Sequence, residues 1–230
     1  MINILRKELK ELSKSKEILL YYIIIVLTLG VVIPISSKES ILGGNWYVMG
    51  LVFQIIAITL PSNLTADLFA GEKERKTIET LLFSPISVTT IYVGKVLYAI
   101  LMPLIIIIFS FITSYITISI MYYQRYNVIS FSLYSFIAIY TIVINSLIIV
   151  SFAAFLGAFF SLKFKKVREV NLINVFVSMP IIMPLASKLY SARITWSFIF
   201  KYELVLIILS ISFIVLVNKF FTRQTIMKNS

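Results

Sequence analysis

Residues 71–87 read GEKERKTIETLLFSPIS, and this charged stretch separates two apolar runs. The first run extends from about Trp46 to Ala66, and the second begins at Ser87. A hydrocarbon core of about 30 Å requires roughly 20 predominantly apolar residues from a helix that crosses it, and both runs are long enough. We therefore expect a charged segment at a membrane surface, between two membrane-spanning helices.

Composition places the whole chain in a membrane. Of its 230 residues, 60% are hydrophobic and 13% are charged, whereas soluble domains carry about 25% charged residues. The net charge of +11 suits lipid headgroups and membrane orientation better than nucleic acid, so no nucleic-acid partner is expected. The chain contains no Cys and no His. Disulfides, thiol chemistry and the usual transition-metal ligands are thereby excluded, and we predict no metal site.

The fold class predicted from the stretches between charges is an all-α integral membrane protein, with residues 1–230 forming a single transmembrane domain. In lipid the backbone polar groups must be satisfied within each span, which requires helices, and the alternation typical of a barrel is absent. The third and fourth runs exceed the roughly 20 residues needed, so these helices must tilt or protrude. The six predicted spans are residues 18–35, 46–66, 87–123, 131–162, 170–187 and 204–221.

Basic residues divide unequally between the two sides of these spans. With six spans both termini share a side, and that side carries 16 Lys and Arg residues against 5 on the other. The positive-inside rule therefore places both termini, and the charged segment, in the cytoplasm. We predict a multi-pass protein of the cell (plasma) membrane.

The amino-terminal residues 1–17 resemble an interfacial helix. Ile2, Leu5 and Leu9 recur at helical spacing, with basic residues on the opposite side. A polar extension of the first span remains the alternative.

Residues 67–86 form the predicted cytoplasmic segment. Gly71 permits a break after the second span, and a short helix is expected from Glu72 to about Phe83. Pro85 ends that helix, while Ser87 is a suitable N-cap for the third span. From the residues alone, a solvated loop is an equal alternative to a surface that binds a partner.

The fifth span contains Pro180 and Pro184, four residues apart on one face. Each removes a helical hydrogen bond, so we expect a kink in the outer half of this helix. Residues 188–203 follow it and include Trp196. They are too apolar for a free loop and too short to span, which predicts short re-entrant helices at the outer surface.

The charged segment resembles the signature of ATP-binding cassette (ABC) type-2 transporter permeases. The similarity rests on GEKER at residues 71–75, on T-x-E-x-L-L at 77–82, on S-P-x-S at 84–87 and on Gly94-Lys95. It extends over the chain, since such permeases have an amphipathic start and six spans with both ends cytoplasmic. One departure is Lys76, where these proteins usually have glycine, and this predicts a straighter helix there.

The resemblance implies that the segment is a coupling helix, which docks on a separate ATPase subunit. The implied ATPase-contacting residues are Glu72, Glu74, Arg75, Thr77, Glu79, Leu81, Leu82, Ser84 and Pro85. The implied exit gate is the kinked fifth span with the segment after it, marked by Pro180, Pro184 and Trp196. The chain lacks G-x-x-x-x-G-K-[ST], so it is not itself an enzyme and needs no cofactor; two copies of the partner ATPase would bind ATP and Mg. A second permease copy, identical or similar, would complete a dimer.

Charged residues avoid the middle of every predicted span. Lys95 falls near the inner end of the third, and Lys201 and Glu203 fall at the outer start of the sixth. With no ion or proton route indicated, we expect an amphipathic or hydrophobic cargo, such as a peptide, a lipid-like molecule or a drug. The resemblance implies that this cargo is exported, because such permeases mostly export. An ion-coupled transporter would need intramembrane carboxylates or repeats, and an intramembrane enzyme would need a nucleophile and base. A non-transporting membrane scaffold that recruits a cytoplasmic partner through residues 71–87 remains the alternative.

Overall fold

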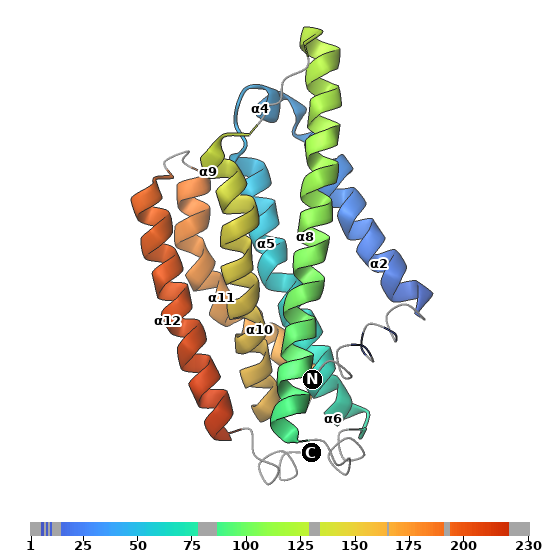
Figure 1. Cartoon of the computed structure of the whole chain (residues 1–230), viewed down its shortest axis with the longest axis vertical. Helices are drawn as coiled ribbons and strands as arrows, with labels where there is room; N and C mark the ends of the chain where they lie inside the picture. The colour runs from blue at the N-terminus through green and yellow to red at the C-terminus, as the bar shows by residue number, and fades with distance from the viewer. Residues whose placement is uncertain are drawn as a thin grey trace.

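The computed structural model describes residues 6, 8, 10, 15–77, 87–128, 134–164, 166–190 and 194–220. Within these ranges every regular element is helical (Figure 1). Six of the helices are long and apolar enough to cross a membrane, as the sequence predicted. These candidate spans are Lys16–Ser36, Tyr47–Glu74, Thr89–Tyr126, Phe136–Lys163, Val167–Tyr190 and Trp196–Val217.

Several spans combine α-helical stretches with short wider π-helical turns, labelled η. The first span comprises α2 (Lys16–Leu27), η1 (Thr28–Val32) and α3 (Ile33–Ser36), and α4 (Lys38–Leu42) follows it. The second comprises α5 (Tyr47–Thr65), η2 (Ala66–Gly71) and α6 (Glu72–Glu74). The remaining elements are α8 (Val88–Tyr126), α9 (Phe136–Ile139), η3 (Tyr140–Ile144), α10 (Asn145–Lys163), α11 (Val167–Tyr190) and α12 (Trp196–Phe220).

Helices α5 and α10 form the centre of the bundle. Helix α10 packs against α5, α8, α11 and α12, and α2 packs on the outside of α8 (Figure 1). The main core cluster accordingly draws Phe53 from α5 and Phe152 from α10, both fully buried. Large apolar side chains such as Phe176 and Met183 lie exposed on the outer helices. An apolar exterior of this kind suits lipid rather than water.

Helix α8 is much longer than a bilayer is thick. Its 39 residues correspond to about 58 Å at 1.5 Å per residue, against a hydrocarbon core of about 30 Å. Figure 1 shows its far end extending beyond the neighbouring helices, near α4. The helix begins as the sequence predicted, because the Ser87 Oγ accepts a hydrogen bond from the Thr90 backbone N–H at 3.2 Å.

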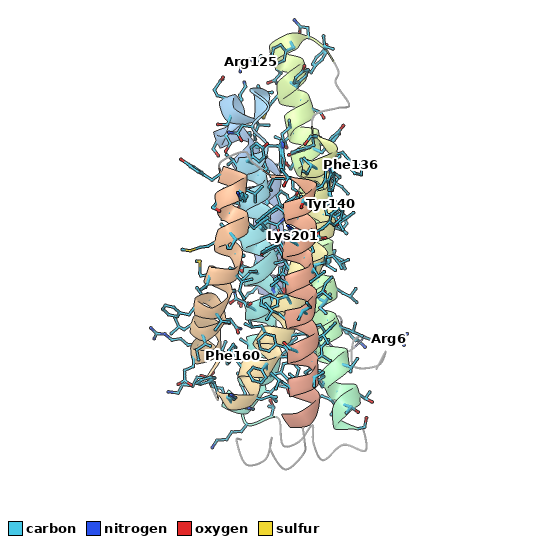
Figure 2. All side chains as sticks on the ribbon, turned by 90° about the vertical axis from the view of Figure 1, so that its left-hand side faces the viewer. Arg6, Arg125, Phe136, Tyr140, Phe160 and Lys201 are labelled. Atoms are coloured by element: carbon cyan, nitrogen blue, oxygen red, sulfur yellow. The ribbon has the colours of Figure 1, made fainter. Side chains whose placement is uncertain are left out.

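The prediction of short re-entrant helices at residues 188–203 is wrong. Helix α11 continues through Pro180 and Pro184 to Tyr190, and α12 is already helical from Trp196. The Trp196 and Phe200 rings pack against the Tyr140 ring, with centroid distances of 5.1 and 6.2 Å. Figure 2 labels Tyr140 beside α12. Trp196 and Phe200 therefore belong to the long helix α12, which contacts Tyr140 of η3, rather than to short separate helices.

Two further predicted segments are only partly described. Of the predicted interfacial helix 1–17, Arg6, Glu8 and Lys10 are helical, and Lys16 already belongs to α2. Residues 78–86 lie outside the described ranges. The break predicted at Gly71 is wrong, because the second span continues as helix through η2 and α6 to Glu74.

Candidate functional site

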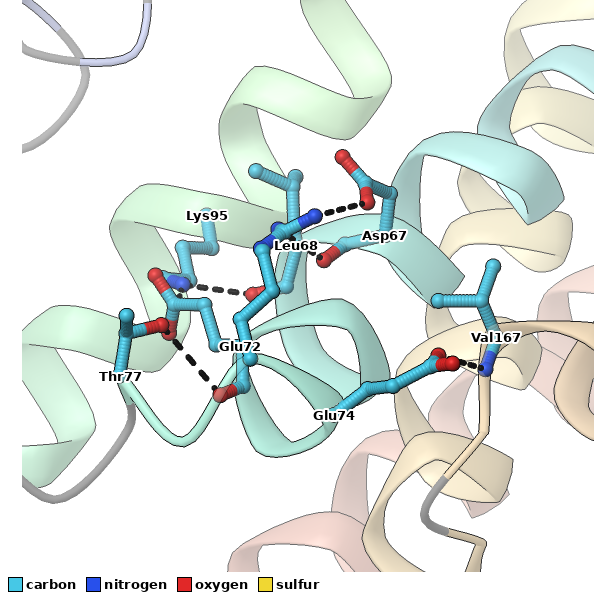
Figure 3. A network of polar contacts seen from close by, with 8 residues as sticks. Asp67, Leu68, Glu72, Glu74, Thr77, Lys95 and Val167 are labelled. Carbon is cyan, nitrogen blue, oxygen red and sulfur yellow. Dashed lines mark hydrogen bonds and ion pairs between the residues drawn. The ribbon is translucent and has the colours of Figure 1, made fainter.

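The candidate site is the single helical turn α6, where the second span ends (Figure 3). Its three side chains, Glu72, Lys73 and Glu74, point in different directions around the turn. Each contacts a different membrane-spanning helix, as described in turn below.

Glu72 joins α6 to α8. Its Oε2 lies 2.5 Å from the Lys95 Nζ, and that ammonium also donates to the Leu68 backbone carbonyl at 2.6 Å. The Lys95 side chain is only 1% exposed and lies 5.5 Å from the centroid of the Phe69 ring. A charge this deeply buried is stable only when it is paired and hydrogen-bonded, so the two helices are held together by the pair.

Lys73 joins α6 to α10. Its Nζ donates to the backbone carbonyls of Ser161 and Leu162 at 2.7 and 3.0 Å, and the residue is buried. These carbonyls lie in the last turn of α10, where no further helical N–H groups are available. The ammonium also complements the negative end of the α10 dipole.

Glu74 joins α6 to α11. Its Oε2 accepts the backbone N–H of Val167, the first residue of α11, at 3.2 Å. The carboxylate thus supplies an N-cap from another part of the chain and lies at the positive end of the α11 dipole. We call Glu72, Lys73 and Glu74 the three-helix clamp.

Arg75 folds back along its own helix. Its Nη1 donates to the Asp67 Oδ1 at 3.0 Å, across the surface of Gly71. A Cβ at Gly71 would lie 2.6 Å from that Oδ1 and 3.0 Å from the Arg75 Nη2. Gly71 therefore provides room for the ion pair and does not end the helix. Both charged side chains are more than half exposed, so the pair itself contributes only about 0–1 kcal/mol.

Lys76 ends the helix in a left-handed conformation, with φ of 56°. Its backbone N–H donates to the Lys73 carbonyl at 3.0 Å, and the Thr77 N–H donates to the Glu72 carbonyl at 2.9 Å. These two bonds form a Schellman motif, in which this position normally carries glycine. The prediction of a straighter helix at Lys76 is wrong, because the chain turns there despite the lysine.

The other predicted site residues are placed as follows. Thr77 is exposed, and its Oγ1 donates to the Glu72 carbonyl at 3.3 Å. Pro180 and Pro184 are exposed on α11, and Trp196 packs with aromatic residues at the start of α12. The predicted residues outside the described ranges are Glu79, Leu81, Leu82, Ser84 and Pro85.

Sequence reasoning missed the partners of Lys95 and the burial of Glu203. Glu203 lies within α12, is 5% exposed and accepts a hydrogen bond from the Tyr140 hydroxyl at 2.9 Å through Oε2. Its Oε1 has no partner among the residues that the structure describes. The signal that could have found both residues is a charged residue inside an apolar run, which usually marks function in a membrane protein.

A family comparison identifies the protein class. Residues 1–184 match the model of the ABC-2 type transporter family. The chain belongs to the ABC-2 type transporter family. No curated protein and no solved structure matched the chain.

Membership in the ABC-2 family defines the general role of the chain. It is the membrane permease of an ABC transporter and has no catalytic site of its own, because in this family ATP hydrolysis belongs to a separate ABC ATPase subunit. ABC-2 permeases generally pair with such subunits. The six candidate spans fit this role.

Proposed function

We propose that this chain is the permease subunit of an ATP-driven exporter. It moves an amphipathic or hydrophobic cargo outward, such as a peptide, a lipid-like molecule or a drug. Two ATPase subunits drive it from the cytoplasm, and a second permease copy, identical or similar, completes the translocation path. The termini and residues 71–87 face the cytoplasm of a cell whose plasma membrane holds the complex.

The observation that carries this proposal is the three-helix clamp. The helical turn at the start of the predicted coupling helix, residues 72–74, is bound to α8 by Glu72, to α10 by Lys73 and to α11 by Glu74. A displacement of residues 71–77 is therefore transmitted directly to three spans. Rigid-body motion of this kind is how hydrolysis at one site can open a path at another.

The clamp divides the predicted coupling residues into two groups. Glu72 and Glu74 contact other membrane-spanning helices, whereas the exposed Arg75 and Thr77 form hydrogen bonds with Asp67 and Glu72 of the second span. We assign the first group to force transmission. The second group, together with Glu79, Leu81, Leu82, Ser84 and Pro85, is assigned to ATPase docking, and Pro180, Pro184 and Trp196 to the exit gate.

The test separates docking from transmission. Arg75→Ala with Glu79→Ala should weaken ATPase binding in a pull-down and reduce transport in reconstituted vesicles. Glu72→Gln should leave ATPase binding intact and reduce cargo-stimulated hydrolysis. Undiminished transport by both variants would contradict the proposal. If the ATPase binds but no cargo stimulates its hydrolysis, the chain acts as the non-transporting scaffold instead.

A further inference from the structure

The two oxygens of the Glu203 carboxyl group have different surroundings. Glu203 is the eighth residue of α12, about 10 Å along the helix from Trp196. Its Oε2 accepts the Tyr140 hydroxyl at 2.9 Å. Its Oε1 is inaccessible to water and has no hydrogen-bond partner among the residues that the structure describes. The carboxyl group therefore has a single hydrogen bond, from a neutral donor on η3.

No cation in the described part of the chain forms an ion pair with Glu203. Lys201 lies two positions earlier on α12 and is exposed, and side chains two positions apart do not face each other on a helix. Helix α10, which packs against α12, has one charged residue, Lys163 in its last turn. Lys163 lies about 35 Å further along the fourth span than Tyr140. Tyr140 is thus the titratable side chain that faces Glu203 from the elements packed on this part of α12.

An ionised carboxylate would be unstable in these surroundings. A buried charge requires a counter-charge or several hydrogen bonds, and one hydroxyl does not replace them. The next residues of α12, Leu204 and Val205, are exposed apolar side chains, so a bilayer around the helix adds no polar partner. A carboxylic acid avoids this cost, because an unpaired O–H is far less unfavourable than an unpaired charge.

The observed hydrogen bond indicates which oxygen carries the proton. Oε2 accepts the Tyr140 hydroxyl, as the carbonyl oxygen of a carboxylic acid does. The acid proton is then on Oε1, the oxygen that has no donor near it among the described residues. In a membrane protein, an ionisable side chain within a span commonly marks a place where protons are bound and released.

We propose that Glu203 is a proton-binding site of the sixth span. The proton is bound at Oε1 while α12 packs on η3. When the two helices separate, water reaches the carboxyl group and accepts the proton, which leaves a hydrated carboxylate. Acid therefore favours the packed arrangement and alkali the separated one. The part of this exchange in a transport cycle rests on the function proposed above, whereas the proton site does not.

Infrared difference spectroscopy tests the protonation state of Glu203. Purified protein in nanodiscs is measured at neutral pH, where an exposed glutamate is ionised. The difference between wild type and Glu203→Gln should contain the C=O stretching band of a carboxylic acid. Glu39→Gln is the matched control, because Glu39 is exposed and paired with Arg125, and its difference spectrum should contain a carboxylate band. A carboxylate band in the Glu203→Gln difference spectrum would overturn the proposal.

Tyr140→Phe tests which oxygen carries the proton. The variant removes the hydroxyl that donates to Oε2, and a carbonyl without a hydrogen bond vibrates at higher frequency. The C=O band of the acid should therefore remain and shift to higher frequency. An unshifted band would place the proton on Oε2 instead. This spectrum also reports the acid directly if Glu203→Gln does not fold, since wild type and Tyr140→Phe then differ by the shifted band.

A separate experiment tests proton exchange during transport. In vesicles whose ATPase sites face the bath, the lumen is the outer side of the orientation proposed above. Acid in the lumen should slow cargo-stimulated hydrolysis in wild type, because the proton stays on Glu203, and should not slow it in Glu203→Gln. Equal pH profiles would overturn the exchange and leave the infrared result standing. If no cargo stimulates hydrolysis at any pH, the exporter is overturned and the proton site is retained.

Discussion

The Glu72 carboxylate and the Lys95 ammonium lie 2.5 Å apart, and Lys95 is almost completely buried between α6 and α8. Removing one partner leaves the other charge uncompensated, which typically costs about 3–5 kcal/mol. We predict that Glu72→Gln and Lys95→Met each lower the thermal unfolding temperature of the purified protein. The unfolding temperature of the double variant should fall by less than the sum of the two single decreases, because the double variant contains no unpaired charge. Additive losses would show that the two groups do not interact.

Lys76→Gly should stabilise the end of the second span. Lysine in the left-handed conformation costs roughly 1–2 kcal/mol, which glycine avoids. The free energy of unfolding should rise by about 1 kcal/mol, as measured by chemical denaturation in detergent. Lys76→Ala is the matched control, since it removes the same charge and keeps a Cβ; an equal gain in that variant would assign the effect to charge.

The effect of Gly71→Ala on the thermal stability of the protein should depend on Asp67. In the wild-type background the new Cβ displaces the Asp67–Arg75 ion pair. In an Asp67→Ala background the carboxylate is absent and the unpaired Arg75 side chain can move aside, so alanine in a helix gains about 0.5–1 kcal/mol over glycine. Thermal unfolding of the four proteins in this cycle checks the prediction. The same effect in both backgrounds would mean that the ion pair does not cross Gly71.

The contact between α4 and α8 should be lost in acid. Glu39 accepts a hydrogen bond from the Arg125 Nη1 at 2.8 Å, and this bond and charge lower the pKa of Glu39 below its ordinary value of 4.5. A depressed pKa means that the contact is fully present above the ordinary pKa and is lost as the pH falls through the lowered one. Spin labels at Ser40→Cys and Gln124→Cys, both exposed and helical, should show a distance distribution that broadens below about pH 4.

Glu39→Gln is the control for this pH effect. It should show the broad distribution at every pH, because its amide cannot form the ion pair. A pH transition that persists in Glu39→Gln would assign the effect to another group.

Orientation is tested with single cysteines, since the chain has none of its own. Ser84→Cys in intact cells should resist an impermeant thiol reagent and react after permeabilisation. Ser40→Cys, within α4, should react in intact cells. Gly44 is a poor choice for the second label because its φ of 84° disfavours any side chain. Reaction of Ser84→Cys in intact cells would place residues 71–87 on the outer side.

Local features of the fold could be predicted from the sequence. The six spans follow from apolar runs that need no tertiary information, and the Ser87 N-cap follows from local hydrogen bonding. The start of α12 could not be predicted in the same way. The apolar run predicts a sixth span from residue 204, after Glu203. Packing of Trp196 on Tyr140 extends the helix toward its start and buries Glu203 within it.

The contacts of the site depended on tertiary structure. The signature predicted the importance of residues 71–77 but not that Lys73 meets the end of α10 or that Glu74 meets the start of α11. Those helix ends are 88 and 93 residues away in the chain. Lys76 was misjudged because its left-handed conformation is set by the Schellman bonds rather than by its own preference.

Helix α8 forms an ion pair near each end: Lys95 pairs with Glu72, and Arg125 pairs with Glu39. A rigid helix held at one end can move only by tilting about that end. If one end is held, a tilt of about 5° sweeps the tip of a 58 Å rod by about 5 Å, the pitch of one helical turn. Under the proposed function, a small displacement near the α6 end of the rod would become a larger displacement at its α4 end.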